Sequence, residues 1–110
     1  MANRKVIEYR TTGSSPFAAW FSALDAQAAA KVAAALYRLE QGNVSNVKSV
    51  GKGVSEYKID FGPGYRIYFG QEGDELVILL GGGAKKSQNK DIMAAQMLWA
   101  EYKQAKARKK

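Results

Sequence analysis

The stretch from Gly51 to Ile92 constrains the fold most, because it contains three short strand patterns joined by two tight connections. Apolar and polar residues alternate over residues 54–61 and 65–69, and an apolar run covers residues 76–80. The first connection is Gly62-Pro63-Gly64, and the second is also only a few residues long. Connections this short favour antiparallel neighbours. The segment therefore predicts a three-stranded antiparallel meander.

Helix signals flank the meander. Ser15 followed by Pro16 predicts a helix start, and Asp25 predicts a second one, so residues 15–42 form a predicted helical hairpin. A final helix is expected to begin with Ser87 or Asn89 as its cap. With a first strand over residues 5–10, the predicted fold class is α+β: N-terminal strand, helical hairpin, three-stranded antiparallel meander and C-terminal helix.

The chain has 110 residues, 46% of them apolar, which suits one domain over residues 1–110 with a modest core. No apolar run reaches the roughly 18 residues that a membrane span needs. The N-terminus lacks the apolar segment of a secretory signal, so a cytoplasmic protein is expected. The core is predicted to centre on Ile7, Phe17, Trp20, Val32, Leu36, Ile59, Ile67, Val77, Leu79 and Trp99.

The chain contains no cysteine and no histidine. This excludes disulfides, thiolate nucleophiles, imidazole bases and the usual transition-metal ligands, so neither a metal nor a cofactor is expected. Any chemistry must use lysine, arginine, tyrosine, carboxylates or hydroxyls. The formal charge is +7, and much of it lies in the basic C-terminal tail, residues 103–110. Such a tail suits nucleic acid, or is simply a solvated helix end.

Residue parity predicts a polar face on the meander. If residues 62–64 form the whole turn, Asp60 lies opposite Arg66, and Lys58 lies opposite Tyr68. A slip by one residue would mix apolar and charged faces. These four side chains are therefore expected to share one face, either as part of a functional site or as an exposed face with an ordinary cross-strand ion pair.

The meander also predicts a basic pole and an acidic pole. Strand direction brings Lys85 and Lys86 to the end of the sheet that carries Gly62–Gly64, while the acidic turn, residues 72–75, lies at the opposite end. Cations beside an aromatic ring are what single-stranded RNA binding requires. The three glycines at 81–83 are interpreted either as a phosphate-binding nest or as a tight exit from a strand.

Several motifs give the chain a family resemblance. They are Pro16-Phe17 with Trp20, Gly42-Asn43 with Val47-Lys48, the string GVSEYKIDFGPGYRIYF over residues 53–69, and Lys85 with Gln88 and Asp91-Ile92. Over nearly its whole length the chain resembles the RelE/ParE superfamily of toxins from type II toxin–antitoxin modules. Within it, the most similar branch is the HigB-like, phage Gp49-like addiction module killer proteins.

The resemblance implies a toxin that is a ribosome-dependent mRNA interferase. Such an enzyme is a metal-independent endoribonuclease, in which the 2′-hydroxyl of the bound codon attacks the adjacent phosphodiester and translation stops. The implied partners are the ribosome, mRNA and a cognate antitoxin, commonly a HigA-like helix-turn-helix protein. Contact with operator DNA would come only through the antitoxin, and no membrane is involved.

The resemblance also implies roles for individual residues. Arg66 matches the arginine that stabilises transition-state charge, and Lys58 matches a basic position that activates the 2′-hydroxyl. Lys85 and Lys86 match the basic loop that protonates the leaving oxygen or binds phosphate. The implied substrate-binding residues are Tyr68, Lys48 and Asp91.

Two alternatives to the mRNA interferase stay open on the sequence. A ParE-type toxin, which inhibits gyrase, shares the fold. The other alternative is a degenerate protein that only binds an antitoxin or nucleic acid. Two departures from the family pattern keep it open: Asp60 stands where some superfamily nucleases have a second basic residue, and Ala84 stands where relatives have an aspartate.

Overall fold

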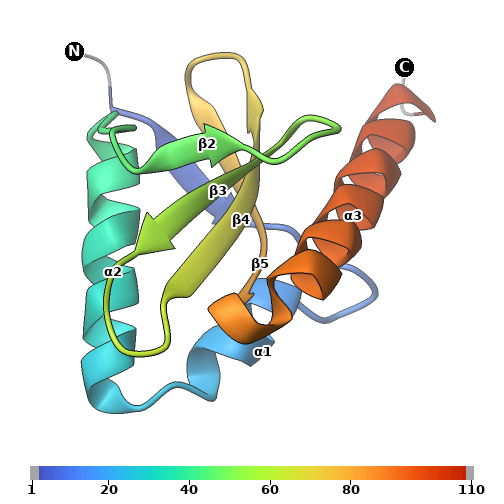
Figure 1. Ribbon diagram of the computed structural model, residues 1–110. Helices are drawn as coiled ribbons and strands as arrows, with labels where there is room; N and C mark the ends of the chain where they lie inside the picture. The colour runs from blue at the N-terminus through green and yellow to red at the C-terminus, as the bar shows by residue number, and fades with distance from the viewer. Residues whose placement is uncertain (1–2, 109–110) are drawn as a thin grey trace.

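A computed structural model describes residues 3–108, in which a five-stranded sheet lies between two helical layers (Figure 1). The sheet order is β1-β5-β4-β3-β2, with β1 parallel to β5 and every other pair antiparallel. The strands are β1 (Lys5–Glu8), β2 (Val47–Ser49), β3 (Val54–Ile59), β4 (Tyr65–Glu72) and β5 (Leu76–Ala84). The helices are α1 (Pro16–Ser22), α2 (Ala26–Glu40), the 3-10 turn η1 (Lys85–Ser87) and α3 (Gln88–Arg108). The predicted α+β fold class is confirmed.

The helical hairpin forms because both of its predicted starts are capped. Ser15 Oγ accepts a hydrogen bond from the backbone N–H of Ala18 at 3.0 Å, and Asp25 Oδ1 accepts one from Ala28 at 2.8 Å. The hairpin covers one face of the sheet. Its core contains Phe17, Val32, Ala35, Leu39, Tyr57, Ile59, Ile67, Phe69, Val77 and Leu79.

Helix α3 covers the other face, so the meander is buried on both sides rather than on one. Trp99 of α3 lies against Gly53 and Gly70, where the ring occupies the space that a Cβ atom would fill. A second core forms here from Val54, Tyr68, Ile78, Leu80, Ala95 and Trp99. The polar face predicted for the meander is therefore partly covered.

Most of the predicted core residues are buried, but the prediction is wrong for Ile7. Its side chain is 37% exposed, whereas its neighbour Val6 packs on the α2 side. The cause is that β1 is an edge strand, and its α3-facing side is not covered at Ile7. Trp20 and Leu36 are partly buried against the core, and the other seven predicted residues are buried.

The region predicted as a loop after α2 contains an extra strand. Residues 47–49 form β2, which pairs with β3 and extends the sheet. At the other end of the meander, β5 continues through Gly81–Gly83 to Ala84, so these glycines are neither a nest nor an exit loop. A Cβ atom on Gly82 would collide with the Trp20 ring, and one on Gly83 with the Asp91 carboxylate.

Helix α3 begins at Gln88, so Ser87 directly precedes it and Asn89 lies inside it. It continues to Arg108, which makes most of the predicted basic tail helical; residues 109 and 110 lie outside the described residues. Lys106 in this tail forms an ion pair with Glu72 at the acidic pole. Within residues 3–108, no helix combines the length and the apolar character that membrane crossing requires.

Candidate RNA-binding and catalytic site

The register between β3 and β4 differs from the predicted one by two residues. Lys58 lies opposite Arg66, and Glu56 lies opposite Tyr68. The predicted pairs, Asp60 with Arg66 and Lys58 with Tyr68, are therefore wrong. A shift by an even number preserves parity, so Lys58, Arg66 and Tyr68 still belong to the same side of the sheet.

The turn between these strands explains the difference. It covers residues 60–64, because β3 ends at Ile59. The backbone N–H of Phe61 donates to Ile59 O, and that of Gly64 donates to Phe61 O, each at 3.0 Å. Gly62 and Gly64 both have positive φ, at 55° and 77°, which glycine adopts without strain. Asp60 therefore belongs to the turn and not to the strand pair.

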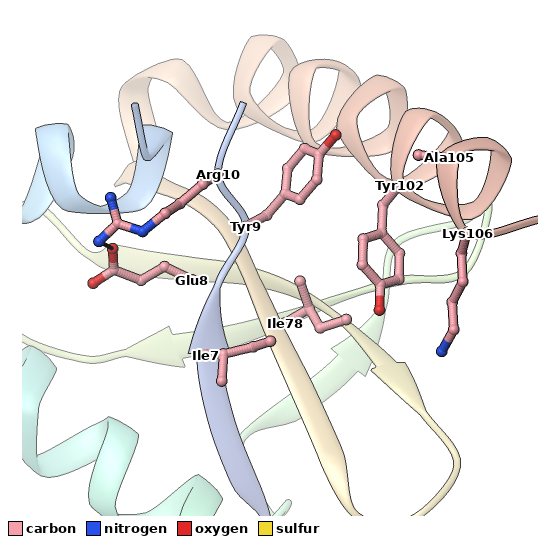
Figure 2. A pocket seen from close by; sticks show the side chains of 8 residues that line it. All are labelled: Ile7, Glu8, Tyr9, Arg10, Ile78, Tyr102, Ala105 and Lys106. Atoms are coloured by element: carbon pink, nitrogen blue, oxygen red, sulfur yellow. Dashed lines mark ion pairs between the residues drawn. The ribbon is translucent and has the colours of Figure 1, made fainter. Parts of the chain in front are cut away.

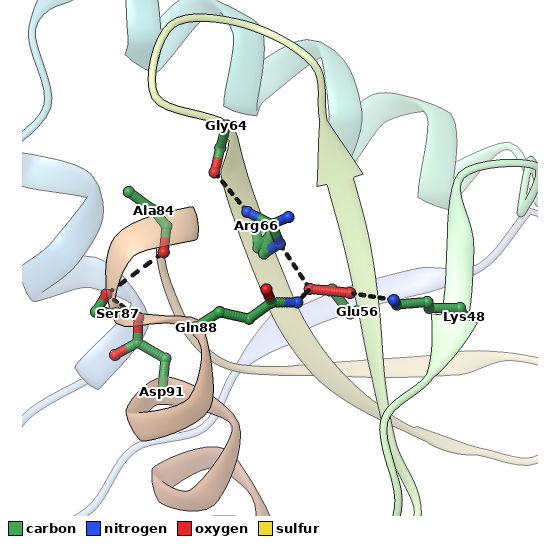
Figure 3. Close-up of polar contacts among 8 residues, drawn as sticks. All are labelled: Lys48, Glu56, Gly64, Arg66, Ala84, Ser87, Gln88 and Asp91. Carbon is green, nitrogen blue, oxygen red and sulfur yellow. Dashed lines mark hydrogen bonds and ion pairs between the residues drawn. The ribbon is translucent and has the colours of Figure 1, made fainter.

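The Arg66 guanidinium is buried and fixed at two of its nitrogens (Figure 3). Nε lies 2.8 Å from Glu56 Oε1, and Nη1 donates to Gly64 O at 2.9 Å. The contact between Nε and Oε1 is an ion pair whose angle falls outside that of a hydrogen bond, so no hydrogen-bond acceptor for Nε is present among the described residues. Only 6% of the Arg66 side chain is exposed.

Glu56 is the residue that sequence reasoning missed. Its side chain is 1% exposed, yet it contacts three other elements of the fold. Oε1 accepts a hydrogen bond from Gln88 Nε2 of α3 at 2.8 Å and meets Arg66 of β4, while Oε2 lies 3.8 Å from Lys48 Nζ of β2. The sequence offered one indication of this role: Glu56 is two residues from Lys58, so both lie on the same face of the strand.

The lysines surround this buried pair. Lys58 is exposed on β3, directly across from Arg66. Lys85 and Lys86 are exposed on η1, and the Lys85 side chain lies next to Gly64, where a Cβ atom would be 3.6 Å from Lys85 Cβ. Lys48 is 69% exposed on β2. Four cations thus gather with Arg66 at one end of the sheet.

Two hollows flank Arg66. One, of about 490 Å³, lies over β2 and β3 and is lined by Lys48, Glu56, Lys58 and Asp60 among others. The second, of about 730 Å³, is lined by residues 84–90. Arg66 is on β4, which lies between β3 and β5. A nucleic-acid backbone laid across this end of the sheet would therefore meet lysines on both sides of the arginine.

Tyr68 and Asp91 lie beneath this surface. Tyr68 has no exposed surface on which a base could stack, and its hydroxyl has no hydrogen-bond partner among the described residues. Burial, followed by the negative charges of Glu56 and Asp91, raises the pKa of Tyr68. Asp91 is half-buried, and its Oδ2 accepts a hydrogen bond from Ser87 Oγ at 2.5 Å. Both side chains therefore contribute to the packing of α3 on the sheet.

A separate cleft of about 460 Å³ opens between β1 and α3 (Figure 2). Ile7, Tyr9, Ile78 and Tyr102 give it a largely apolar lining, and Lys106 and Arg10 lie at its edges. It contains none of the residues that surround Arg66, so it is distinct from the basic site.

The chain matches known proteins over most of its length. The family model described as phage derived protein Gp49-like (DUF891) matches residues 19–110. A protein of Haemophilus influenzae described as uncharacterized is 44% identical over 96 residues, which is 86% of this chain and 95% of that protein. The matched family is similar to the toxins of toxin–antitoxin modules, which implies a cognate antitoxin as partner. The chain belongs to the Gp49-like family of phage-derived proteins.

Proposed function

We propose that this protein is the toxin of a type II toxin–antitoxin module and acts as a ribosome-dependent mRNA interferase of RelE/HigB type. One observation carries the proposal: Arg66 and Lys58 face each other across β3 and β4, with Lys85 beside the same turn. This arrangement offers a buried, oriented guanidinium and several exposed ammonium groups to a phosphate. Family membership supports the toxin part of the proposal.

The proposed reaction is cleavage of a phosphodiester by its own 2′-hydroxyl. The 2′-oxygen forms a bond to phosphorus, the bond to the 5′-oxygen breaks, and a cyclic phosphate and a 5′-hydroxyl result. Arg66 stabilises the charge that develops on the phosphoryl oxygens, and Lys58 activates the 2′-hydroxyl. The 2′-hydroxyl proton passes to Lys58 or to water. Lys85 or Lys86 gives a proton to the leaving 5′-oxygen, which balances that loss, and the other of the two lysines holds the neighbouring phosphate.

The ribosome supplies the substrate in this proposal. A shallow basic surface binds a single strand through its phosphates. Base recognition by stacking is not expected, because no exposed aromatic ring lies beside Arg66 in the described residues. Codon positioning then comes from the ribosomal A site in the cytoplasm. A helix-turn-helix antitoxin of HigA type is the proposed inhibitor, and it would also carry any contact with operator DNA.

The test is mRNA cleavage in a purified translation extract. Added protein should produce new mRNA 5′ ends that fall in frame, only when ribosomes are present, and Arg66→Ala should abolish them. Glu75→Gln serves as a charge control, because Glu75 is exposed in the acidic turn at the opposite end of the sheet. Intact mRNA and continued translation would refute the proposal.

The burial of Arg66 favours a second candidate, a non-catalytic protein that only binds an antitoxin or nucleic acid. An arginine with 6% of its side chain exposed and a carboxylate partner makes a restricted phosphate ligand. In that case, strong expression without antitoxin leaves growth unaffected. Growth arrest with intact mRNA and reduced supercoiling activity would instead identify a ParE-type gyrase inhibitor.

A further inference from the structure

We infer that Glu56 is a positioning residue for the proposed cleavage, which orients the Arg66 guanidinium so that its third nitrogen faces the phosphate. The inference rests on the proposed function. Neither the family match nor the sequence motifs assign a role to Glu56. It comes from the contacts of one almost fully buried carboxylate.

The first step concerns the geometry of the guanidinium. Glu56 occupies Nε, and the Gly64 carbonyl occupies Nη1. These two contacts fix the plane and the rotation of the guanidinium, and among the described residues no ion pair or hydrogen bond uses Nη2. A fork anchored in this way presents its remaining N–H donors in one direction.

The second step concerns what fixes Glu56 itself. Gln88 Nε2 donates to Oε1 from the first residue of α3, and Lys48 approaches Oε2 from β2. The carboxylate is therefore held from β2, from β4 and from α3 at once. It connects the two hollows on either side of Arg66, since Glu56 lines the first and Gln88 lines the second.

The third step concerns charge. Arg66 and Glu56 have side-chain exposures of 6% and 1%, so each is the main counter-charge available to the other. A buried arginine without that carboxylate would turn toward water, because an isolated buried charge is costly. Retaining the arginine in a fixed direction therefore depends on the negative charge of Glu56, and not only on the shape of its side chain.

The test compares Glu56→Gln with wild type in single-turnover cleavage of ribosome-bound mRNA. The substitution keeps the shape and an acceptor oxygen but removes the charge. We expect the saturating rate to fall by about 10- to 100-fold, because a small misplacement of a charge-stabilising group has an effect of that size. The ribosome concentration at half-saturation should change little, since the surrounding lysines remain. Glu75→Gln, which removes an equal charge at the acidic pole, should behave as wild type. A wild-type rate in Glu56→Gln would overturn the inference.

A spectroscopic readout separates this inference from the proposed function. Arg66 Nε is shielded from water and lies against Glu56 Oε1, so in wild type its N–H should give a resolved NMR signal in slow exchange with water because of burial. In Glu56→Gln, that signal should shift and broaden by exchange. If wild type fails to cut mRNA, the proposed function is wrong, yet this signal still reports whether Glu56 orients the guanidinium. An unchanged signal in Glu56→Gln would refute the positioning role.

A second variant covers the case in which Glu56→Gln does not fold. Gln88→Ala removes the hydrogen bond from α3 to Oε1 while leaving the buried ion pair in place. We expect a smaller fall in the saturating rate, about tenfold or less, together with faster exchange of the Arg66 Nε–H. If both quantities match wild type in this variant, the inference fails.

Discussion

Glu56 Oε1 and Arg66 Nε lie 2.8 Å apart beside the first turn of α3, and both side chains are more than nine-tenths buried (Figure 3). The pair joins β3 to β4 diagonally, because Lys58 is directly opposite Arg66 and Glu56 is opposite Tyr68. It takes the place of the ion pair that the sequence suggested between Asp60 and Arg66. Burial makes each charge dependent on the other, because removing either one leaves a buried charge without its counter-ion.

The stability of the fold should therefore respond to this pair in a non-additive way. Arg66→Ala should lower the free energy of unfolding by about 3–5 kcal/mol, since it leaves a buried carboxylate without its counter-ion. In that background, Glu56→Gln should raise the free energy of unfolding, whereas in wild type the same change should lower it. Urea denaturation followed by tryptophan fluorescence measures all four proteins.

Lys48→Ala is the control for this cycle. Lys48 is 69% exposed and lies 3.8 Å from Glu56, so its removal should change the free energy of unfolding by less than about 1 kcal/mol. If the effects of Arg66→Ala and Glu56→Gln simply add, the two side chains do not depend on each other as argued.

The glycines of β5 should differ sharply in their tolerance of a methyl group. Gly82→Ala places a Cβ atom into the Trp20 ring, and we expect a loss of about 1–3 kcal/mol from overpacking. Gly81→Ala is the matched control, because a Cβ atom there has nothing within 4 Å and the backbone is not left-handed. Equal thermal stability of the two variants would contradict the packing of Trp20 on Gly82.

Local signals predicted the helices well. Ser15 and Asp25 were recognisable as caps because the capping oxygen and the N–H that it binds lie three residues apart in the chain. The faces of β3 and β4 were predictable as well, because residue types alternate along both strands of the sequence. These features depend on neighbours in sequence, so one sequence suffices to find them.

The register and the buried carboxylate depend on distant contacts. Turns over residues 62–64 and over residues 60–64 give the same parity, so hydrophobic patterning cannot choose between them. The burial of Glu56 requires α3 to return over the sheet and bring Gln88 to it, 32 residues later in the chain. Likewise, β2 is a short strand of three residues that is recognisable mainly through its pairing with β3.

Tyr68→Phe should stabilise the protein. The Tyr68 hydroxyl is buried and has no hydrogen-bond partner among the described residues, and such a group costs about 1–3 kcal/mol. Removing it should raise the free energy of unfolding and leave mRNA cleavage at the wild-type rate. A loss of cleavage with unchanged folding would show instead that the tyrosine contacts the substrate, as the family resemblance implied.

The contact between α3 and the β4–β5 turn should make the fold sensitive to alkali. Burial, together with a hydrogen bond to Glu72 at 2.6 Å, raises the pKa of Tyr102 from 10.0 to about 12. A raised pKa in the folded state stabilises the protein below pH 10, and this contribution is lost as the pH rises from about 10 to about 12.

Tyr102→Phe should flatten that part of the stability curve, when the free energy of unfolding is measured between neutral pH and pH 12. Tyr37→Phe is the control, because Tyr37 is 62% exposed on α2. A curve for Tyr102→Phe that falls as steeply as that of wild type would show that the hydroxyl of Tyr102 is not responsible.

The lysines around Arg66 should contribute to the binding of single-stranded RNA as well as to the proposed chemical step. Lys85→Ala should weaken the binding of single-stranded RNA and reduce the slope of log affinity against log salt by about 0.7, which is the value for one lost phosphate contact on a single strand. Lys103→Ala removes the same charge near Trp99, close to the acidic pole, and should leave the slope unchanged. Fluorescence anisotropy of a labelled RNA across a salt series measures both. An equal loss in the two variants would mean that RNA responds to the overall charge of the protein, and the basic pole would then have no special role in binding.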